Sequence, residues 1–282
     1  MHTDSIRCLN PVGFHQMVYH EWGSAENDRV IVCVHGLARN SRDFDELALA
    51  LSRDYRVICP DIVGRGESDW LPAGQVYGIP QYLNDITALL ARLNVDKVDW
   101  VGTSMGGIIG MCLAALPNSP IKHLVLNDIG AFVPASSLKR ISEYLGDKQF
   151  QSLSEVEAYM RDTYESFKHL SDRQWHHLAK HGSRLDENEV HHLHYDPAIA
   201  QATADASSED VDLWPVWSAI NIPQLLIWGE ESDVLQEETV RKMQANDKLE
   251  LISIPGIPHV PSLMESEQIH QVQNWLREHR KD

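Results

Sequence analysis

Cysteine is scarce in this sequence, and it does not occur in the pairs that build disulfide frameworks or zinc sites. The chain has four cysteines among 282 residues, and no two of them form a C-x-x-C pair. Cys8, Cys33, Cys59 and Cys112 lie mostly inside apolar runs, where a free thiol behaves as a small buried apolar group. We therefore expect free thiols, no metal centre and a reducing compartment.

Basic residues and long apolar runs are scarce as well. The chain has 24 lysines and arginines against 41 aspartates and glutamates, which gives a net charge of −17. Nucleic acids and anionic membranes attract clustered positive charge, so we expect neither as a partner. No run approaches the roughly 18 apolar residues of a membrane span, and the N-terminal stretch lacks a basic region followed by an apolar one. These absences predict a soluble, cytoplasmic protein.

What the sequence does contain is a regular alternation of strand-like and helix-like segments. Compact β-branched runs, as in buried strands, alternate with segments whose apolar residues recur every three to four positions. The strand-like runs are residues 30–34, 56–59, 98–101, 123–126, 223–228 and 249–254. The helix-like segments are residues 43–51, 82–93, 107–116 and 263–280, and residues 12–22 alternate like two short antiparallel strands. This order predicts an α/β fold in which helices cover both faces of a mostly parallel, twisted sheet.

Residues 133–213 break the alternation. This stretch is polar, rich in histidine and glutamate, and helical in pattern without strand-like runs. We interpret it as a helical cap inserted between the sixth and seventh strands, above the carboxyl ends of the strands, where open α/β sheets bind ligands. Residues 1–132 and 214–282 then form one core, which a chain of this length with 43% hydrophobic residues can build.

The pentapeptide Gly102-Thr103-Ser104-Met105-Gly106 lies between a strand-like and a helix-like segment. The pattern G-x-S-x-G in this position is typical of a nucleophile elbow, in which a sharp turn lifts a serine hydroxyl above the sheet. Glycines are needed on both sides because strand and helix approach closely there, and the helix N-terminus stabilises a developing negative charge. The sequence therefore predicts Ser104 as a nucleophile.

A serine nucleophile needs a general base, and the base needs a carboxylate that orients it. Of the 15 histidines, His259 is the one that lies in a loop between a late strand and the terminal helix, on the same rim as Ser104. Asp233 follows the preceding strand on that rim, which makes it the predicted acid. Asp128, just after residues 123–126, is the alternative acid. The chain order serine, aspartate, histidine is expected of one serine-triad fold and not of the others.

Two further motifs complete a resemblance to the α/β-hydrolase superfamily that covers nearly the whole chain. The tripeptide His35-Gly36-Leu37 is similar to the oxyanion-loop signature of that superfamily, and residues 61–68 are similar to its D-x-x-G-x-G-x-S segment. The resemblance implies an α/β-hydrolase fold. It also implies an oxyanion hole formed by the backbone N–H groups of Leu37 and Met105.

Together these residues predict two-step acyl transfer on a small carboxylic ester or lactone. Ser104 attacks the carbonyl, His259 moves the proton and Asp233 orients the imidazole, and this chemistry needs no cofactor or metal. Three other functions stay open. Carbon–carbon bond hydrolases of the superfamily generally have tryptophan after the catalytic histidine, where Val260 stands here, and cofactor-free haloperoxidases or perhydrolases share the triad. The third is a non-catalytic ligand receptor, and the oligomeric state is not readable from the sequence.

Three other sets of residues have a structural role as their simplest interpretation. Asp61 and Arg65 are expected to pair and to brace a turn. His177 and His181 lie four residues apart, but no carboxylate-bearing metal motif accompanies them, so we expect a solvated helix face that mild acid would loosen. The tryptophans are expected in the core, with a pocket wall as the alternative: these are Trp175, Trp214, Trp217 and Trp228.

Overall fold

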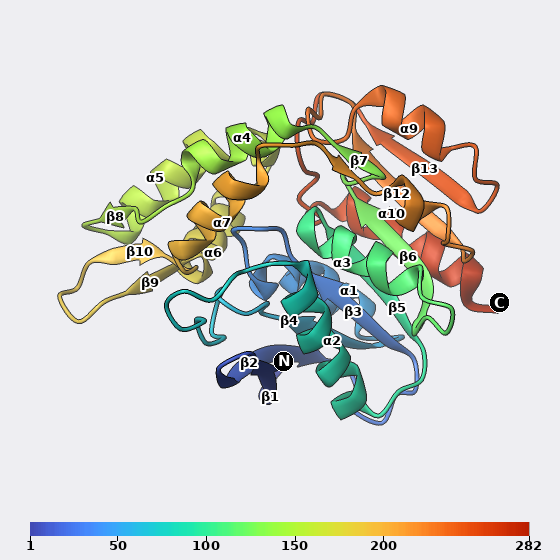
Figure 1. Cartoon of the computed structure of the whole chain (residues 1–282), viewed down its shortest axis with the longest axis horizontal. Helices are drawn as coiled ribbons and strands as arrows, with labels where there is room; N and C mark the ends of the chain where they lie inside the picture. The colour runs from blue at the N-terminus through green and yellow to red at the C-terminus, as the bar shows by residue number, and fades with distance from the viewer. Residues whose placement is uncertain (282) are drawn as a thin grey trace.

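The structure, a computed structural model, describes residues 1–281 and is built around one eight-stranded sheet (Figure 1). Residue 282, the last of the predicted core segment, lies outside the described residues. The strands are β1 (His2–Asn10), β2 (Gly13–Trp22), β3 (Val30–Val34), β4 (Arg56–Pro60), β5 (Val98–Thr103), β6 (Ile121–Asn127), β12 (Gln224–Gly229) and β13 (Leu249–Ile254). Their order across the sheet is β1-β2-β4-β3-β5-β6-β12-β13. From β4 to β13 all neighbours are parallel, which confirms the predicted α/β class.

The amino-terminal edge of the sheet differs from the prediction. Residues 12–22 were expected to hold two short strands, but residues 13–22 form the single strand β2, which pairs antiparallel with β1 over residues 2–10. Gly13, the first residue of β2 after the turn at residues 11–12, has a φ of 146°, which is accessible to glycine at little cost. The short alternating pattern was therefore one half of a longer hairpin, and β2 also pairs antiparallel with β4.

Two apolar cores lie on the two faces of the sheet, as the alternation of side chains along β3 shows. Val30, Val32 and Val34 belong to the core that contains α2 (Ile79–Leu93) and α3 (Met105–Ala114). Ile31 and Cys33 belong to the other core, with α1 (Asp45–Leu51) and α10 (Ser266–Glu278). Successive residues of a strand point to opposite faces, so one apolar strand serves both cores. A further helix, α9 (Glu237–Met243), which the sequence pattern did not predict, packs into the first core through Val240 and Met243.

Residues 129–223, called the insertion below, follow Asp128 and lie between β6 and β12; they contribute no strand to the eight-stranded sheet (Figure 1). The helices of the insertion are α4 (Ala135–Tyr144), α5 (Leu153–Thr163), α6 (Asp172–His181), α7 (Ala198–Ala206) and α8 (Trp214–Trp217). The prediction of helices alone was wrong, because β8 (Gln149–Phe150), β9 (Ser183–Leu185) and β10 (His191–Leu193) form a small sheet, and β7 (Phe132–Val133) pairs with β11 (Val211–Asp212). Strands of two or three residues are too short to show a period of two.

Two expectations from composition can be compared with the structure. Cys8, Cys33 and Cys59 are buried free thiols, as predicted, and Cys112 is a free thiol that is partly exposed. In residues 1–281, no helix has the length and apolar character needed to cross a membrane.

Candidate active site

Ser104 lies at the junction of β5 and α3 in a conformation that few residues adopt. Its φ is 49° and its ψ is −113°, values that a non-glycine residue keeps only when its surroundings enforce them. A Cβ atom on Gly102 would lie 2.4 Å from the backbone carbon of Gly106, and one on Gly106 would lie 2.0 Å from the carbonyl oxygen of Val34. The two glycines of the pentapeptide are therefore required by close backbone approach.

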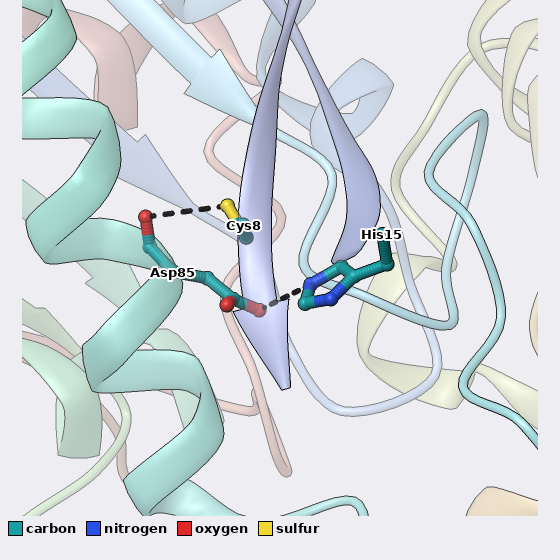
Figure 2. A group of neighbouring side chains, drawn as sticks. All are labelled: Cys8, His15 and Asp85. Atoms are coloured by element: carbon teal, nitrogen blue, oxygen red, sulfur yellow. Dashed lines mark hydrogen bonds and ion pairs between the residues drawn. The ribbon is translucent and has the colours of Figure 1, made fainter. Parts of the chain in front are cut away.

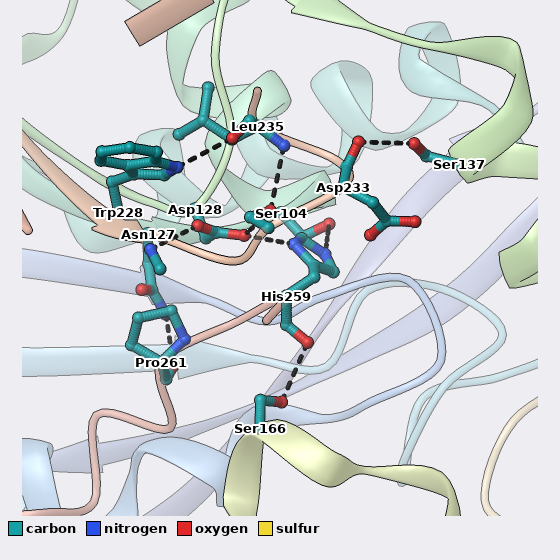
Figure 3. A network of polar contacts seen from close by, with 12 residues as sticks. Ser104, Asn127, Asp128, Ser137, Ser166, Trp228, Asp233, Leu235, His259 and Pro261 are labelled. Atoms are coloured by element: carbon teal, nitrogen blue, oxygen red, sulfur yellow. Dashed lines mark hydrogen bonds and ion pairs between the residues drawn. The ribbon is translucent and has the colours of Figure 1, made fainter. Parts of the chain in front are cut away.

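Ser104, His259 and Asp128 form a continuous hydrogen-bonded chain (Figure 3). The Nε2 atom of His259 lies 3.1 Å from the Oγ atom of Ser104, and its Nδ1 atom lies 2.6 Å from Oδ2 of Asp128. The three residues follow β5, β6 and β13, so three strands that are distant in sequence present them at the same edge of the sheet. The structure thus brings the predicted serine and histidine together, with the alternative acid as the third member.

The assignment of Asp233 as the acid is wrong in this structure. Both carboxylate oxygens of Asp233 accept hydrogen bonds from Arg140 of α4, at 2.6 and 2.8 Å, and the side chain is 45% exposed. Asp128 instead is fully buried and adopts a φ of 54°, a left-handed conformation that aspartate tolerates better than most residues. The physical reason is reach: Asp128 directly follows the last residue of β6, whereas Asp233 lies four residues beyond β12 and turns towards the insertion.

Asp128 accepts two further hydrogen bonds that sequence reasoning missed. The backbone N–H of Gly229 donates to Oδ1 at 2.8 Å, and the hydroxyl of Ser232 donates to Oδ2 at 2.6 Å. An ionised carboxylate has no proton to donate, so the proton between Asp128 and His259 lies on Nδ1 of the imidazole. The Nε2 atom then offers its lone pair to the hydroxyl of Ser104, which is the tautomer that a general base requires. Ser232 carries no sequence signal besides its place in the loop after β12.

The loop that carries His259 is held from two sides. The side-chain amide of Asn127, at the end of β6, donates to the carbonyl of Pro261 at 2.9 Å. The hydroxyl of Ser166, which comes from the insertion, donates to the backbone carbonyl of His259 at 2.9 Å (Figure 3). The position of the imidazole therefore depends on the sheet and on the insertion together.

The predicted oxyanion donors are free in the structure. The backbone N–H groups of Leu37 and Met105 donate to no protein acceptor within residues 1–281. Buried N–H groups normally have partners, so a pair of free ones beside a serine hydroxyl is suited to bind a ligand oxygen. Nε of Arg65 donates to the carbonyl of Leu37 at 2.8 Å and its Nη1 donates to the hydroxyl of Tyr82 at 2.9 Å, which fixes the loop that carries Leu37.

Residues 61–68 brace this loop without the pairing expected between Asp61 and Arg65. The carboxylate of Asp61 instead accepts from the backbone N–H groups of Ser41 and Glu67, each at 2.8 Å. Nearby, burial lowers the pKa of His35 to about 4, which keeps this imidazole neutral. Its Nε2 atom then accepts the N–H of Ile62 at 3.0 Å.

Two cavities meet at Ser104. The smaller has a volume of about 90 Å³ and is lined by His259, Arg39 and Tyr164 among others. The larger has a volume of about 340 Å³ and an almost wholly apolar lining. Within the described residues, none of the four tryptophans lines either cavity: Trp175 and Trp217 are buried in the core and Trp214 and Trp228 pack against it. The core interpretation of these side chains agrees with the structure.

Cys8, His15 and Asp85 bring possible metal-ligand atoms within 4.8 Å of one another, and all three are buried (Figure 2). The side-chain oxygen of Asn10 accepts the N–H of Val12 at 3.0 Å, so the Asn10 amide nitrogen donates to Nδ1 of His15 at 3.1 Å. The proton of His15 then lies on Nε2 and points to Asp85 at 3.0 Å. This tautomer directs no lone pair into the cluster, so the cluster is a hydrogen-bond relay between α2 and the β1–β2 hairpin.

Comparison with known proteins places the chain among hydrolases. The family model described as alpha/beta hydrolase fold matches residues 29–263. A 3-hydroxybutyrate-oligomer hydrolase from Cupriavidus necator is 44% identical over 275 residues, which cover 94% of each chain. A solved structure of a protein from Rickettsia typhi superposes with a TM-score of 0.92 at 33% identity and 99% coverage of both chains. An alpha/beta hydrolase from Novosphingobium aromaticivorans gives 0.86 at 32% identity, with 98% of both chains covered.

Proposed function

The chain belongs to the α/β-hydrolase family, and on that premise we propose that it is a serine hydrolase that cleaves small carboxylic esters through an acyl-enzyme. One observation carries the proposal: the hydroxyl of Ser104 has its base, His259, within hydrogen-bond distance, and the base has a buried carboxylate behind it. Leu37 and Met105, whose backbone N–H groups have no protein acceptor within residues 1–281, line the larger cavity together with Ser104. This set of groups matches the requirements of acyl transfer.

The reaction proceeds in two steps. In the first, His259 takes the proton of Ser104 as its oxygen attacks the ester carbonyl, and the N–H groups of Leu37 and Met105 stabilise the oxyanion. His259 returns the proton to the leaving alcohol oxygen as the carbon–oxygen bond breaks. In the second step, His259 takes a proton from water, the resulting hydroxide attacks the acyl group, and Ser104 is released with its proton restored.

The ester is proposed to be a short hydroxy-acid ester, with 3-hydroxybutyrate oligomers as the first substrates to test. Support comes from the Cupriavidus necator relative, which carries that activity in its name at 44% identity over 94% of both chains. The larger cavity beside Ser104, with its apolar lining, would hold the acyl part of such an ester. A lactone is an internal ester, so the same groups would open one of suitable size.

The test combines p-nitrophenyl esters of increasing acyl length, the 3-hydroxybutyrate dimer and trimer, and a serine-directed phosphonate. We expect the wild-type protein to hydrolyse short esters and to take the label. Ser104→Ala should keep its circular dichroism spectrum, lose the label, and lose turnover by about 10⁴-fold or more. Labelling at Ser104 without turnover of any ester would refute ester hydrolysis and point to another bond, whereas no labelling and no turnover would refute the serine hydrolase itself.

A further inference from the structure

The two cavities beside Ser104 differ in the chemistry of their walls. Ser104, Leu37 and Ile141 line both, so both open at the reacting centre. The walls of the larger cavity are aliphatic over most of their area: they include Ile79, Ile108, Ile129, Leu138, Ile199 and Leu213. The smaller cavity contains charged and hydroxyl groups. An ester bound at Ser104 extends in two directions from its carbonyl carbon, so each cavity receives one half of the substrate.

The position of His259 decides which half enters which cavity. The leaving alcohol oxygen must lie within hydrogen-bond reach of the general acid that protonates it. His259 lines the smaller cavity and does not line the larger one, and the neighbouring Val260 and Pro261 lie on the same side. The alcohol half of the ester therefore enters the smaller cavity. The acyl half enters the larger, apolar one.

Charged groups line the smaller cavity, and the one carboxylate among its lining residues is already paired. Asp43 is the carboxylate in its wall, and both oxygens are occupied by Arg39, at 2.8 and 2.6 Å. Two of the five N–H groups of Arg39 make these bonds, and the third contact is to the sulfur of Met160 at 3.9 Å. The guanidinium also packs against the ring of Tyr164, with the Cζ atom of Arg39 5.1 Å from the centroid of that ring.

Two tyrosine hydroxyls add to this surplus of donors. Tyr144 and Tyr164 line the smaller cavity, and neither hydroxyl donates to an acceptor within residues 1–281. Burial raises the pKa of Tyr144, so its hydroxyl keeps its proton and remains a donor. Donors that face a partly open cavity can bond to a ligand that brings several acceptor lone pairs, and a carboxylate is such a group.

The volume of the smaller cavity limits the length of the group it accepts. A water-sized group needs roughly 10–15 Å³ of such volume, so about 90 Å³ accommodates about six to nine heavy atoms. A single short hydroxy acid has this size. The larger cavity of about 340 Å³ has room for an acyl part of more than one unit.

We propose that the smaller cavity binds the leaving group as a short hydroxy acid with a free carboxylate, so that oligomers are cut at the ester bond next to their carboxyl end. This inference rests on the proposed ester hydrolysis and adds which end of an oligomer is cleaved first. In the first step, the acyl carbon–oxygen bond breaks, a bond to Ser104 forms, and the hydroxy acid leaves with the proton from His259. Water then releases the shortened acyl part, and each turnover removes one unit.

Two substrates that differ in one charge test the carboxylate. We expect the wild-type protein to release acetate from 3-acetoxybutyrate with a kcat/KM at least about tenfold higher than from neutral 3-acetoxybutanamide. Tyr144→Phe and Arg39→Met should reduce this ratio several-fold, and Tyr19→Phe, remote from both cavities with its hydroxyl bonded to Asp4, should leave it unchanged. Should Arg39→Met fail to fold, Tyr144→Phe alone carries the comparison.

The direction of cleavage has a separate readout. A 3-hydroxybutyrate trimer labelled at its hydroxyl end should first give a labelled dimer and an unlabelled monomer. A labelled monomer as the first product would overturn the proposal, and so would equal kcat/KM values for the acid and the amide. In both of those cases esters are still hydrolysed, so ester hydrolysis itself would stand. Loss of turnover on every ester, with no phosphonate labelling of Ser104, would refute the proposed function instead.

Discussion

The rim of the sheet and the insertion contribute to the candidate site in different ways. At the rim, Ser104, Asp128 and His259 each follow a strand of the sheet, and the backbone itself sets their positions. The insertion supplies walls of both cavities and reaches the triad through one side-chain hydrogen bond, from Ser166 to the carbonyl of His259. Under the proposed function, the rim supplies the reacting groups, and the insertion shares the cavity walls with core loops such as the one that carries Leu37 and Arg39.

Asp128 and Asp233, which follow neighbouring strands, have different partners. Asp128 is buried and bonded to His259, whereas Asp233 binds Arg140 of α4 and accepts the hydroxyl of Ser137 at its backbone carbonyl, at 2.7 Å (Figure 3). Asp128 is therefore the carboxylate that would orient His259 in the proposed reaction. Asp233 belongs to the attachment of the insertion.

The largest expected effect comes from exchanging these two carboxylates for amides. Asp128→Asn should lower kcat by about 10³- to 10⁴-fold, because an amide cannot hold the imidazole in the tautomer that accepts the serine proton. Asp233→Asn should change kcat by less than about threefold, since an exposed ion pair contributes about 0–1 kcal/mol. Steady-state kinetics on one short ester measures both. Comparable losses in the two variants would remove the distinction between rim and insertion.

An intermediate effect is expected where the insertion touches the triad. Ser166→Ala removes the hydrogen bond to the carbonyl of His259, whose net value is about 1 kcal/mol, so kcat should fall about fivefold. Ser142→Ala is the matched control, because that hydroxyl bonds only within α4, to the carbonyl of Lys139. If Ser166→Ala behaves like Ser142→Ala, the insertion shapes the cavities without positioning the base.

The smallest effect concerns stability, at the contact between the insertion and the core beside α6. Burial, the charge of Arg42 and the neighbouring His177 lower the pKa of His181 to about 4, and Arg42 donates to its Nδ1 atom at 3.2 Å. The charge of Asp45 raises the pKa of His181, whereas the charge of Lys180 lowers it, as the charge of Arg42 does. At His181, the unfolded chain takes up a proton below about pH 6.5, but the folded chain does so only near pH 4. The contribution of His181 to the free energy of unfolding is therefore fully present above about pH 6.5 and is lost as the pH falls.

The urea midpoint of unfolding should therefore fall as the pH falls from about 6.5 to about 4. His181→Asn, which cannot titrate, should flatten this fall, and His270→Asn on the exposed side of α10 should not. Mild acid would then loosen the insertion, as the sequence suggested, but through a half-buried histidine that contacts Arg42 and not through a solvated face. An unchanged slope in His181→Asn would assign the acid sensitivity to other groups.

Ser104 and His259 could be predicted from sequence because each has a local signature. The elbow requires glycines within two residues of Ser104, and His259 lies alone in the last loop before the terminal helix. The acid has no such signature. Asp128 and Asp233 both follow strands that are neighbours in the sheet, and the choice between them depends on the direction of a side chain in space. Arg140, which occupies Asp233, lies 93 positions away in the chain, a distance over which sequence patterns carry no information.

The parallel core could be predicted for a related reason. Strands such as β3 and β12 are buried on both faces, so their apolar runs stand out in the sequence. The short strands β8 to β11 and the contacts of the insertion depend on tertiary pairing between segments of two or three residues. The cavity walls follow from those contacts, and substrate choice was therefore the least predictable property.

The insertion is attached to the core through two short segments that pair with each other. The chain leaves β6 and returns at β12, which are adjacent strands, and β7 pairs with β11 so that Val133 lies opposite Val211. The N–H of Leu213 continues this ladder by bonding the carbonyl of Ala131 at 2.8 Å. A chimera joined within this two-stranded stalk would receive a foreign cap while keeping Asp128, whereas a junction a few residues earlier would discard the acid. Recombination within the β7–β11 pair could therefore change the substrate specificity without changing the triad.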